Sequence, residues 1–318
     1  MRGVILDFAS LAADDLDLAC LDSALDEWTH YESTPPVDVL SRIQHADVIL
    51  TNKVVLDRSH FKACPNLKLV VIMATGTNNV DLDAAREYGV PVCNVAGYST
   101  HSVVQYTFAS LLSLRNRMPE YSQAVREGRW QESQFFGLLE YPIEEVHGSV
   151  LGIVGMGAIG QAVAAVAKAF GMQVLVAESV QGPKPGRVPL LDMLPRVDAL
   201  SLHCPLTPET KGLIGDEALS LMKPSAVIIN AARGGVVDEV ALADALRRGV
   251  IAGAAVDVLT VEPPSHSHPL MAPDIPNLLL TPHIGWASRQ ARQRLVDQMA
   301  AMIRSFRSGH RVLCVNGV

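Results

Sequence analysis

The sequence predicts an α/β fold of two lobes, each built on a parallel β-sheet. Along the 318 residues, short apolar runs alternate with segments of helical periodicity, a rhythm typical of parallel sheets covered by helices. One long helical pattern, residues 99–117, interrupts the alternation, and a second strand–helix series begins at residue 150. We interpret the long helix as the connector between two lobes, and the chain length suits about two domains.

The first series predicts strands at residues 4–8, 47–50, 67–74 and 90–95, with helices at 57–63 and 81–88 between them. After the second series, residues 288–308 again show helical periodicity, and we expect this helix to return the chain to the first lobe. The predicted domains are therefore residues 1–98 together with 288–318, and residues 99–287.

The second series contains a glycine pattern between a strand and a helix. Its six predicted strands are residues 150–154, 173–177, 199–203, 227–230, 253–258 and 278–281. Gly155, Gly157 and Gly160 follow the first of them in the spacing G-x-G-x-x-G. The first glycine permits a tight turn, the second lets backbone approach a pyrophosphate, and the third lets helix and strand pack closely. The pattern predicts a Rossmann-type, doubly wound dinucleotide domain, although a glycine-rich turn without a ligand is the plainer alternative.

Glu178 follows the next predicted strand, 18 residues after Gly160. A carboxylate at this place can accept hydrogen bonds from both ribose hydroxyls of NAD and repels the 2′-phosphate of NADP. NAD is therefore the expected cofactor and NADP is disfavoured, unless Glu178 is only a solvated residue at a strand end.

One arginine, one carboxylate and one histidine come shortly after three of the apolar runs. Arg233 carries a permanently charged planar fork that suits the carboxylate of a 2-oxo acid. His283 can exchange a proton near neutral pH, and Glu262 is a candidate partner to orient its ring. Each residue has an ordinary alternative as a surface or turn residue. Because the carboxyl ends of parallel strands line a ligand crevice, we expect the three to share one site.

The bulk composition excludes several classes of protein. Acidic residues outnumber basic ones, 33 to 26, which argues against nucleic acid or an anionic membrane as a partner. No apolar stretch reaches the length of a membrane helix. The five cysteines are scattered and show no metal-binding spacing, which predicts a reduced cytoplasmic compartment and no metal.

The motifs together resemble the D-isomer-specific 2-hydroxyacid dehydrogenase family, and within it the glycerate dehydrogenase (hydroxypyruvate reductase) branch. The segments that carry the resemblance are residues 74–81, 155–160, 203–207, 230–238, 257–258, 262–263 and 282–288. The resemblance implies that the Rossmann domain is inserted in a smaller flavodoxin-like α/β substrate lobe. It also implies reversible, NAD(H)-dependent reduction of hydroxypyruvate or glyoxylate to D-glycerate or glycolate.

The resemblance further assigns roles to single residues. Arg233 binds and polarises the substrate, Glu262 supports His283, and His283 is the acid/base. Thr75 and Gly76 offer backbone N–H groups to the substrate carboxylate. The residues expected to contact NAD, besides the three glycines, are Thr107, Ala158, Ile159, Glu178, Cys204, Ala231, Asp257, His283, Gly285 and Trp286.

Several alternatives remain open at this point. A non-enzymatic NAD-sensing protein similar to the C-terminal binding protein corepressors would retain the same three residues. A formate dehydrogenase has glutamine where Glu262 stands, and a phosphoglycerate dehydrogenase often carries a further regulatory domain. The residues do not rank hydroxypyruvate against bulkier 2-oxo acids. The aromatic segment at residues 119–141 is similar to the part that forms family dimers, so a homodimer is expected.

Overall fold

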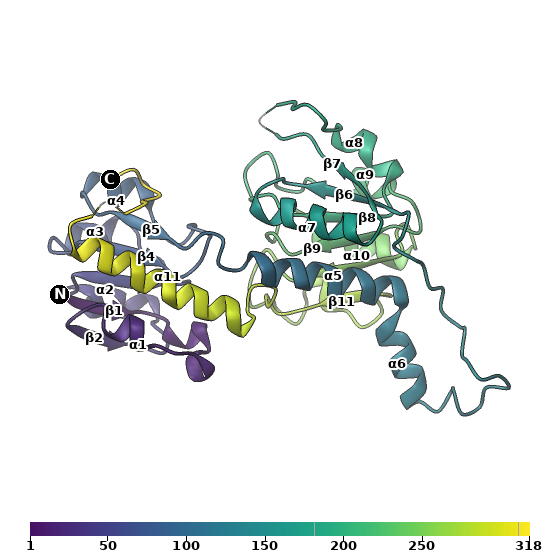
Figure 1. Cartoon of the computed structure of the whole chain (residues 1–318), viewed down its shortest axis with the longest axis horizontal. Helices are drawn as coiled ribbons and strands as arrows, with labels where there is room; N and C mark the ends of the chain where they lie inside the picture. Colours follow the sequence, from purple (N-terminus) through teal and green to yellow (C-terminus); the bar gives the residue numbers. More distant parts are fainter. Residues whose placement is uncertain (181, 311) are drawn as a thin grey trace. The chain divides into compact units, whose positions relative to one another are not determined.

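The computed structural model describes residues 1–180, 182–310 and 312–318. The chain forms two compact units, Met1–Ser99 with Ala287–Val318, and Thr100–Trp286 (Figure 1). Each unit contains one sheet, and the strand pairs of both sheets are parallel. The predicted α/β class is therefore confirmed. In the described ranges, no helix combines the length and the apolar character needed to cross a bilayer.

The sheet of the first unit has the strand order β2-β1-β3-β4-β5, which is the flavodoxin-like order. Its strands are β1 (Arg2–Ile5), β2 (Glu27–His30), β3 (Val48–Thr51), β4 (Leu69–Ile72) and β5 (Val92–Asn94). The sequence does not predict β2. This strand lies at the sheet edge and is largely exposed, so no apolar run marks it.

The helices of the first unit come from both ends of the chain. They are α1 (Ala19–Asp22), α2 (Val39–Ile43), α3 (Arg58–Ala63), α4 (Leu82–Glu87) and α11 (Arg289–Arg307). Ser288 caps α11 by accepting a hydrogen bond from Ala291 N, and α11 packs against α1 (Figure 1). The C-terminal helix therefore lies in the same unit as the first strands.

The sheet of the second unit has the strand order β11-β10-β9-β8-β6-β7. Its strands are β6 (Val150–Val154), β7 (Gln173–Val176), β8 (Ala199–Leu202), β9 (Val227–Asn230), β10 (Gly253–Val256) and β11 (Leu278–Leu280). All six agree with the predicted strands to within two residues. The chain leaves β6 for β7 on one side and continues with β8 on the other, so the strand order reverses between β6 and β8. Ligands bind doubly wound sheets at such a switch point.

Helices cover both faces of this second sheet. They are α5 (Thr100–Asn116), α7 (Ala158–Ala169), α8 (Leu190–Met193), α9 (Asp216–Ser220) and α10 (Glu239–Arg247), and α6 (Met118–Arg126) belongs to the same unit. Neighbouring strand residues pack in opposite directions: Ile229 joins a cluster with α5 and α7, whereas Ile228 joins one with α8, α9 and α10. Two buried clusters therefore pack against the two faces of the sheet and hold the strands, and with them the residues at the strand ends, in fixed positions.

The segment after α5 leaves this layered structure. Figure 1 shows α6 and the chain that follows it extending away from the sheet. Its side chains include several exposed apolar ones, among them Phe135 (78% exposed), Phe136 (98%) and Leu139 (89%). The Tyr121 hydroxyl donates to Tyr141 O at 2.7 Å, which ties α6 to the chain that follows it.

Candidate active site

The glycine turn after β6 lies against the end of β8. Gly155 has a φ of +95°, and a Cβ there would lie 2.6 Å from the carbonyl carbon of His203. A Cβ on Gly160 would lie 2.1 Å from Gly155 O, whereas one on Gly157 would meet nothing within 4 Å. Gly155 and Gly160 are thus required for the turn itself, while Gly157 leaves open space beside the backbone.

The N-terminus of α7 fits an anionic ligand. Gly157 is its N-cap, and no described side chain caps the helix there. The N–H groups of the first turn, which includes Ala158 and Ile159, are therefore available, and the helix dipole favours negative charge beside them. Open space at Gly157 and uncapped N–H groups together suit the pyrophosphate of a dinucleotide.

His203 follows β8 at the same switch point. Its Nε2 forms a 2.8 Å hydrogen bond with Ser201 Oγ, and its Nδ1 is buried with no hydrogen-bond partner among the described residues. Burial lowers the pKa of His203 from 6.5 to about 4. The imidazole is therefore neutral at physiological pH and adds no positive charge to the crevice.

Acidification should destabilise the protein through His203. Because its folded-state pKa of about 4 lies below the ordinary 6.5, the unfolded chain binds this proton more tightly. Stability is then lost as the pH falls from about 6.5 toward about 4. Between pH 7 and pH 5 we expect a contribution of about 1–2 kcal/mol. Urea unfolding at both pH values checks this: His203→Gln, which keeps a polar atom for Ser201, should lose less stability than the wild type, and an equal loss would contradict it.

The other residues predicted to contact the coenzyme occupy different environments. Glu178 follows β7 and is half-buried. Cys204 N lies beside the glycine turn, 2.7 Å from a Cβ built on Gly155, and burial raises the pKa of the Cys204 thiol. Thr107 is fully buried inside α5, where its hydroxyl donates to Val103 O over 2.8 Å. A coenzyme contact of Thr107 stays a prediction.

Arg233 stands in a turn that is shaped by the last residue of β9. Asn230 is buried, and its side chain accepts from Ala232 N and donates to Arg233 O, both at 3.1 Å. The Arg233 guanidinium donates to Ala232 O at 2.7 Å. Asn230 therefore fixes the backbone at Ala232 and Arg233 and presents Arg233 at the carboxyl end of the sheet.

Asp257, directly after β10, holds the loop that carries His283. Its Oδ1 accepts from Thr281 Oγ1 at 2.6 Å and from Ile284 N at 2.8 Å, and its Oδ2 accepts from Gly285 N at 2.7 Å. The side chain is 3% exposed, so these charge-assisted bonds are formed away from water and are strong. The predicted role of Asp257 was a coenzyme contact, and the structure shows it bonded to the loop of residues 281–285.

Glu262 and His283 form a pair in this structure. His283 Nδ1 lies 2.7 Å from Glu262 Oε2, and Glu262 Oε1 accepts from Leu259 N at 2.9 Å. A carboxylate accepts hydrogen bonds, so Nδ1 carries the proton and Nε2 is the nitrogen that can exchange one with a ligand. His283 has a φ of +56°, an uncommon left-handed conformation for a side chain of this size.

Gly234 brings the Arg233 turn against the loop of Glu262. A Cβ on Gly234 would lie 2.0 Å from the carbonyl carbon of Leu259 and 2.4 Å from Thr260 N. Only glycine permits this backbone contact, so Gly234 sets the distance between the two loops. Sequence reasoning missed this role, although the Gly-Gly pair after Arg233 was the signal that could have indicated it.

The second unit thus brings together most of the predicted site. The glycine turn, Cys204, Arg233, Asp257, Glu262 and His283, with Gly285 and Trp286 directly after it, all follow strands at the carboxyl edge of one sheet. Thr75 and Gly76 belong to the other unit, after β4. There the Thr75 hydroxyl donates to Val95 O at 2.9 Å, and Asn94 Nδ2 donates to Thr75 O at 2.6 Å, which orders the turn.

Comparison with known proteins gives consistent matches. Residues 108–285 match the family described as "D-isomer specific 2-hydroxyacid dehydrogenase, NAD binding domain". A glycerate dehydrogenase of Methylorubrum extorquens is 42% identical over 89% of this chain and 90% of its own length. A hydroxypyruvate reductase of Blautia hydrogenotrophica is 38% identical over 99% of this chain and 100% of its own. Among solved structures, an NADPH-dependent glyoxylate/hydroxypyruvate reductase of Sinorhizobium meliloti, in complex with NADP and malonate, is 27% identical with a TM-score of 0.80, covering 98% of this chain and 95% of the other.

Proposed function

Since this chain belongs to the D-isomer-specific 2-hydroxyacid dehydrogenase family, we propose that it reduces hydroxypyruvate or glyoxylate with NADH. Reversible reduction of a 2-oxo acid with a pyridine nucleotide is the activity of the family members it matches. The observation that carries the proposal is the 2.7 Å contact between Glu262 and His283, on the same sheet edge as the glycine turn. This pair supplies the proton exchange that interconversion of a carbonyl and an alcohol requires.

The proposed chemistry assigns a proton transfer to His283. When bound, the reduced coenzyme supplies a hydride to the substrate carbonyl carbon. His283 Nε2–H donates its proton to the carbonyl oxygen, and the imidazole becomes neutral while Nδ1–H stays bonded to Glu262. In the reverse direction the neutral Nε2 accepts the hydroxyl proton, and the Glu262 carboxylate stabilises the imidazolium that forms.

Arg233 and the turn after β4 are the proposed substrate anchors. The Arg233 guanidinium matches a carboxylate and an adjacent carbonyl oxygen in geometry and charge. The backbone N–H groups at Thr75 and Gly76 complete the set by binding the substrate carboxylate. The domain roles follow: residues 1–98 with 288–318 bind substrate, and residues 99–287 bind the coenzyme.

The substrate proposal is tested by turnover with NADH and a panel of hydroxypyruvate, glyoxylate, pyruvate and a branched-chain 2-oxo acid. We expect kcat/KM to be highest for hydroxypyruvate or glyoxylate. A preference for the branched-chain acid would contradict this substrate choice, and the absence of turnover with every member would support an NAD-sensing role instead.

Replacing Glu178 with alanine tests the preference for NADH. The change removes the acceptor for the ribose hydroxyls and the charge that repels the 2′-phosphate of NADP. Hydrogen bonds to a charged group contribute about 1.5–3 kcal/mol, so we expect NADH to bind about 10- to 100-fold more weakly. The affinity for NADPH should fall much less than the affinity for NADH. The measurement is therefore the ratio of kcat/KM for the two coenzymes. An unchanged ratio would show that Glu178 does not bind the ribose hydroxyls.

We also propose a homodimer in the cytoplasm. The exposed apolar side chains of the segment that follows α5, including Phe135 and Phe136, support a second copy of this chain as the partner. The five cysteines are free thiols, which suits a reducing compartment. Light scattering should give twice the mass of the chain, and a monomer mass at micromolar concentration would contradict the dimer.

A further inference from the structure

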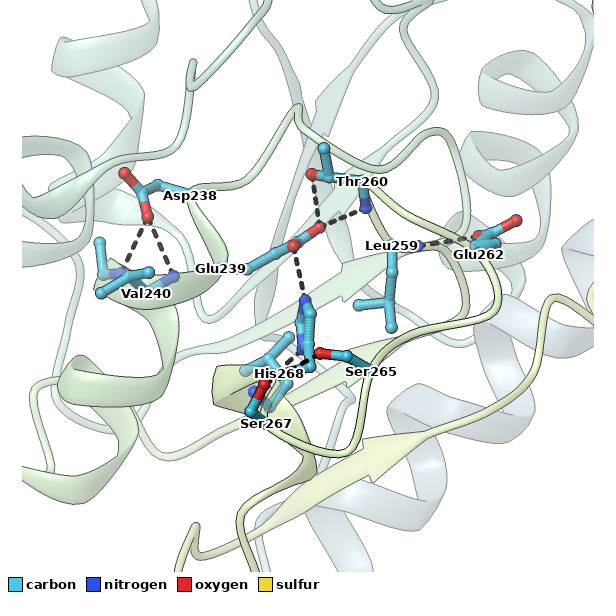
Figure 2. A network of polar contacts seen from close by, with 11 residues as sticks. Asp238, Glu239, Val240, Leu259, Thr260, Glu262, Ser265, Ser267 and His268 are labelled. Atoms are coloured by element: carbon cyan, nitrogen blue, oxygen red, sulfur yellow. Dashed lines mark hydrogen bonds and ion pairs between the residues drawn. The ribbon is translucent and has the colours of Figure 1, made fainter.

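A second carboxylate, Glu239, binds the loop that carries Glu262. Glu239 is the first residue of α10, and its side chain is 12% exposed. Its Oε1 accepts from Thr260 N at 2.7 Å and from Thr260 Oγ1 at 2.8 Å (Figure 2). Two donors from one loop residue fix both the backbone and the side chain of Thr260.

His268 binds the other oxygen of Glu239. It precedes η5 (Pro269–Met271) as its N-cap, and its Nδ1 accepts from Leu270 N at 3.2 Å. Its Nε2 must therefore carry the proton and donate it to Glu239 Oε2, at 2.8 Å (Figure 2). Because the imidazole side chain is 11% exposed, both nitrogens are committed to these contacts and orient Glu239.

Leu259 packs against the apolar core of the second unit, whereas the residues after it, 260–262, are held by polar contacts. Thr260, Val261 and Glu262 are all exposed, and Val261 is 65% exposed. On one side the loop rests on Gly234, and on the other its Thr260 is bound by Glu239. Within the loop, Leu259 N donates to the same Glu262 carboxylate that contacts His283. A displacement of Thr260 is thus transmitted to Glu262 through the adjacent Leu259, whose N–H binds the Glu262 carboxylate.

We propose that Glu239 and His268 are positioning residues for the 2-oxo acid reduction: together they fix residues 259–262 so that the Glu262 carboxylate reaches His283 Nδ1. This inference rests on the proposed function, because it assigns Glu262 and His283 the proton transfer. Neither Glu239 nor His268 touches the reacting atoms. Their effect comes from geometry, and misplacement of a catalytic group by about 1 Å can lower a rate about 100-fold.

Substitution of Glu239 by glutamine tests the carboxylate. In the glutamine variant, the amide oxygen can still accept hydrogen bonds from Thr260. The amide NH₂ group then faces the Nε2–H of His268, so two donors oppose each other and this contact is lost. We expect kcat to fall about 10- to 100-fold while the dissociation constant of NADH is unchanged. In the double variant E239Q/E262Q, kcat should equal that of E262Q alone, because Glu239 acts through Glu262.

Two substitutions of His268 separate its two contacts. His268→Gln carries an amide at the place of Nε2 and can still donate to Glu239, so kcat should stay close to that of the wild type. His268→Asn carries its amide at the place of Nδ1, so it keeps the cap of η5 but loses the contact with Glu239. We expect His268→Asn to lower kcat by about the same factor as E239Q.

Asp238→Ala serves as the matched structural control. Asp238 caps α10 through Val240 N and Ala241 N, both at 3.0 Å, and its side chain points away from Thr260 (Figure 2). Its loss should lower stability by about 1 kcal/mol and leave kcat unchanged. Equal losses of kcat in D238A and E239Q, or multiplied losses in E239Q/E262Q, would overturn the positioning role. If E262Q itself kept the wild-type kcat, the role of Glu262 in the proposed function would fail, and the inference with it.

Discussion

Replacement of His283 by asparagine is expected to lower kcat by about 10²- to 10⁴-fold, the range that a positioned acid/base contributes. Asparagine suits this position because it tolerates the left-handed backbone of His283, φ +56°, better than alanine does. Its amide can still donate to Glu262 but cannot exchange a proton near neutral pH. The effect should therefore fall on the chemical step.

The measurement is steady-state kinetics with NADH and hydroxypyruvate between pH 6 and 9, together with NADH titration. The fall in kcat should exceed any change in KM or in the dissociation constant of NADH, because Arg233 and the glycine turn are not altered. Asp238→Ala, which removes only the cap of α10, is the control. A wild-type turnover number of His283→Asn at every pH would show that another group carries the proton.

The second large effect is expected at the glycine turn, where two single-methyl substitutions should act in different ways. Gly160→Ala places a Cβ 2.1 Å from Gly155 O, so β6 and α7 must separate. We expect a loss of about 2–3 kcal/mol in the free energy of unfolding together with a loss of NADH binding. Gly157→Ala meets nothing within 4 Å at a φ of −76°, so its stability should change by less than about 1 kcal/mol.

NADH binding should nevertheless weaken in Gly157→Ala, by about 10-fold or more, because the methyl group fills the space left for the pyrophosphate. Urea unfolding without coenzyme and fluorescence titration with NADH separate the two effects. If Gly157→Ala bound NADH like the wild type, the pyrophosphate would not lie at this turn.

The sequence was most informative where strands are buried on both faces. The inner strands of the second unit, β6, β8, β9 and β10, are buried and mostly apolar, and the partly buried edge strands β7 and β11 are mostly apolar too, so the ends of all six were predictable to within two residues. β2 gave no such signal, because Glu27–His30 pairs only with β1 and is mostly exposed. In the aromatic segment at residues 119–141, the sequence does not indicate whether the aromatic side chains pack or stay exposed.

The residues proposed to carry the chemistry were predictable from the sequence, but the residues that hold them in position were not. Arg233, Glu262 and His283 follow strands and carry distinctive side chains, and the 2.7 Å contact between Glu262 and His283 agrees with the predicted pairing. Glu239 was not predicted, because an acid at the first position of a helix is ordinary on electrostatic grounds alone. Its partner His268 lies 29 residues away, and no local spacing relates two such residues.

Asp257 and Glu262 support the His283 loop through different contacts. Asp257 binds the backbone N–H groups of Ile284 and Gly285, whereas Glu262 binds the imidazole itself. The Ile284 side chain takes part in neither set of contacts, and Ile284 is 48% exposed. Variation at Ile284 is therefore compatible with an unchanged proton donor.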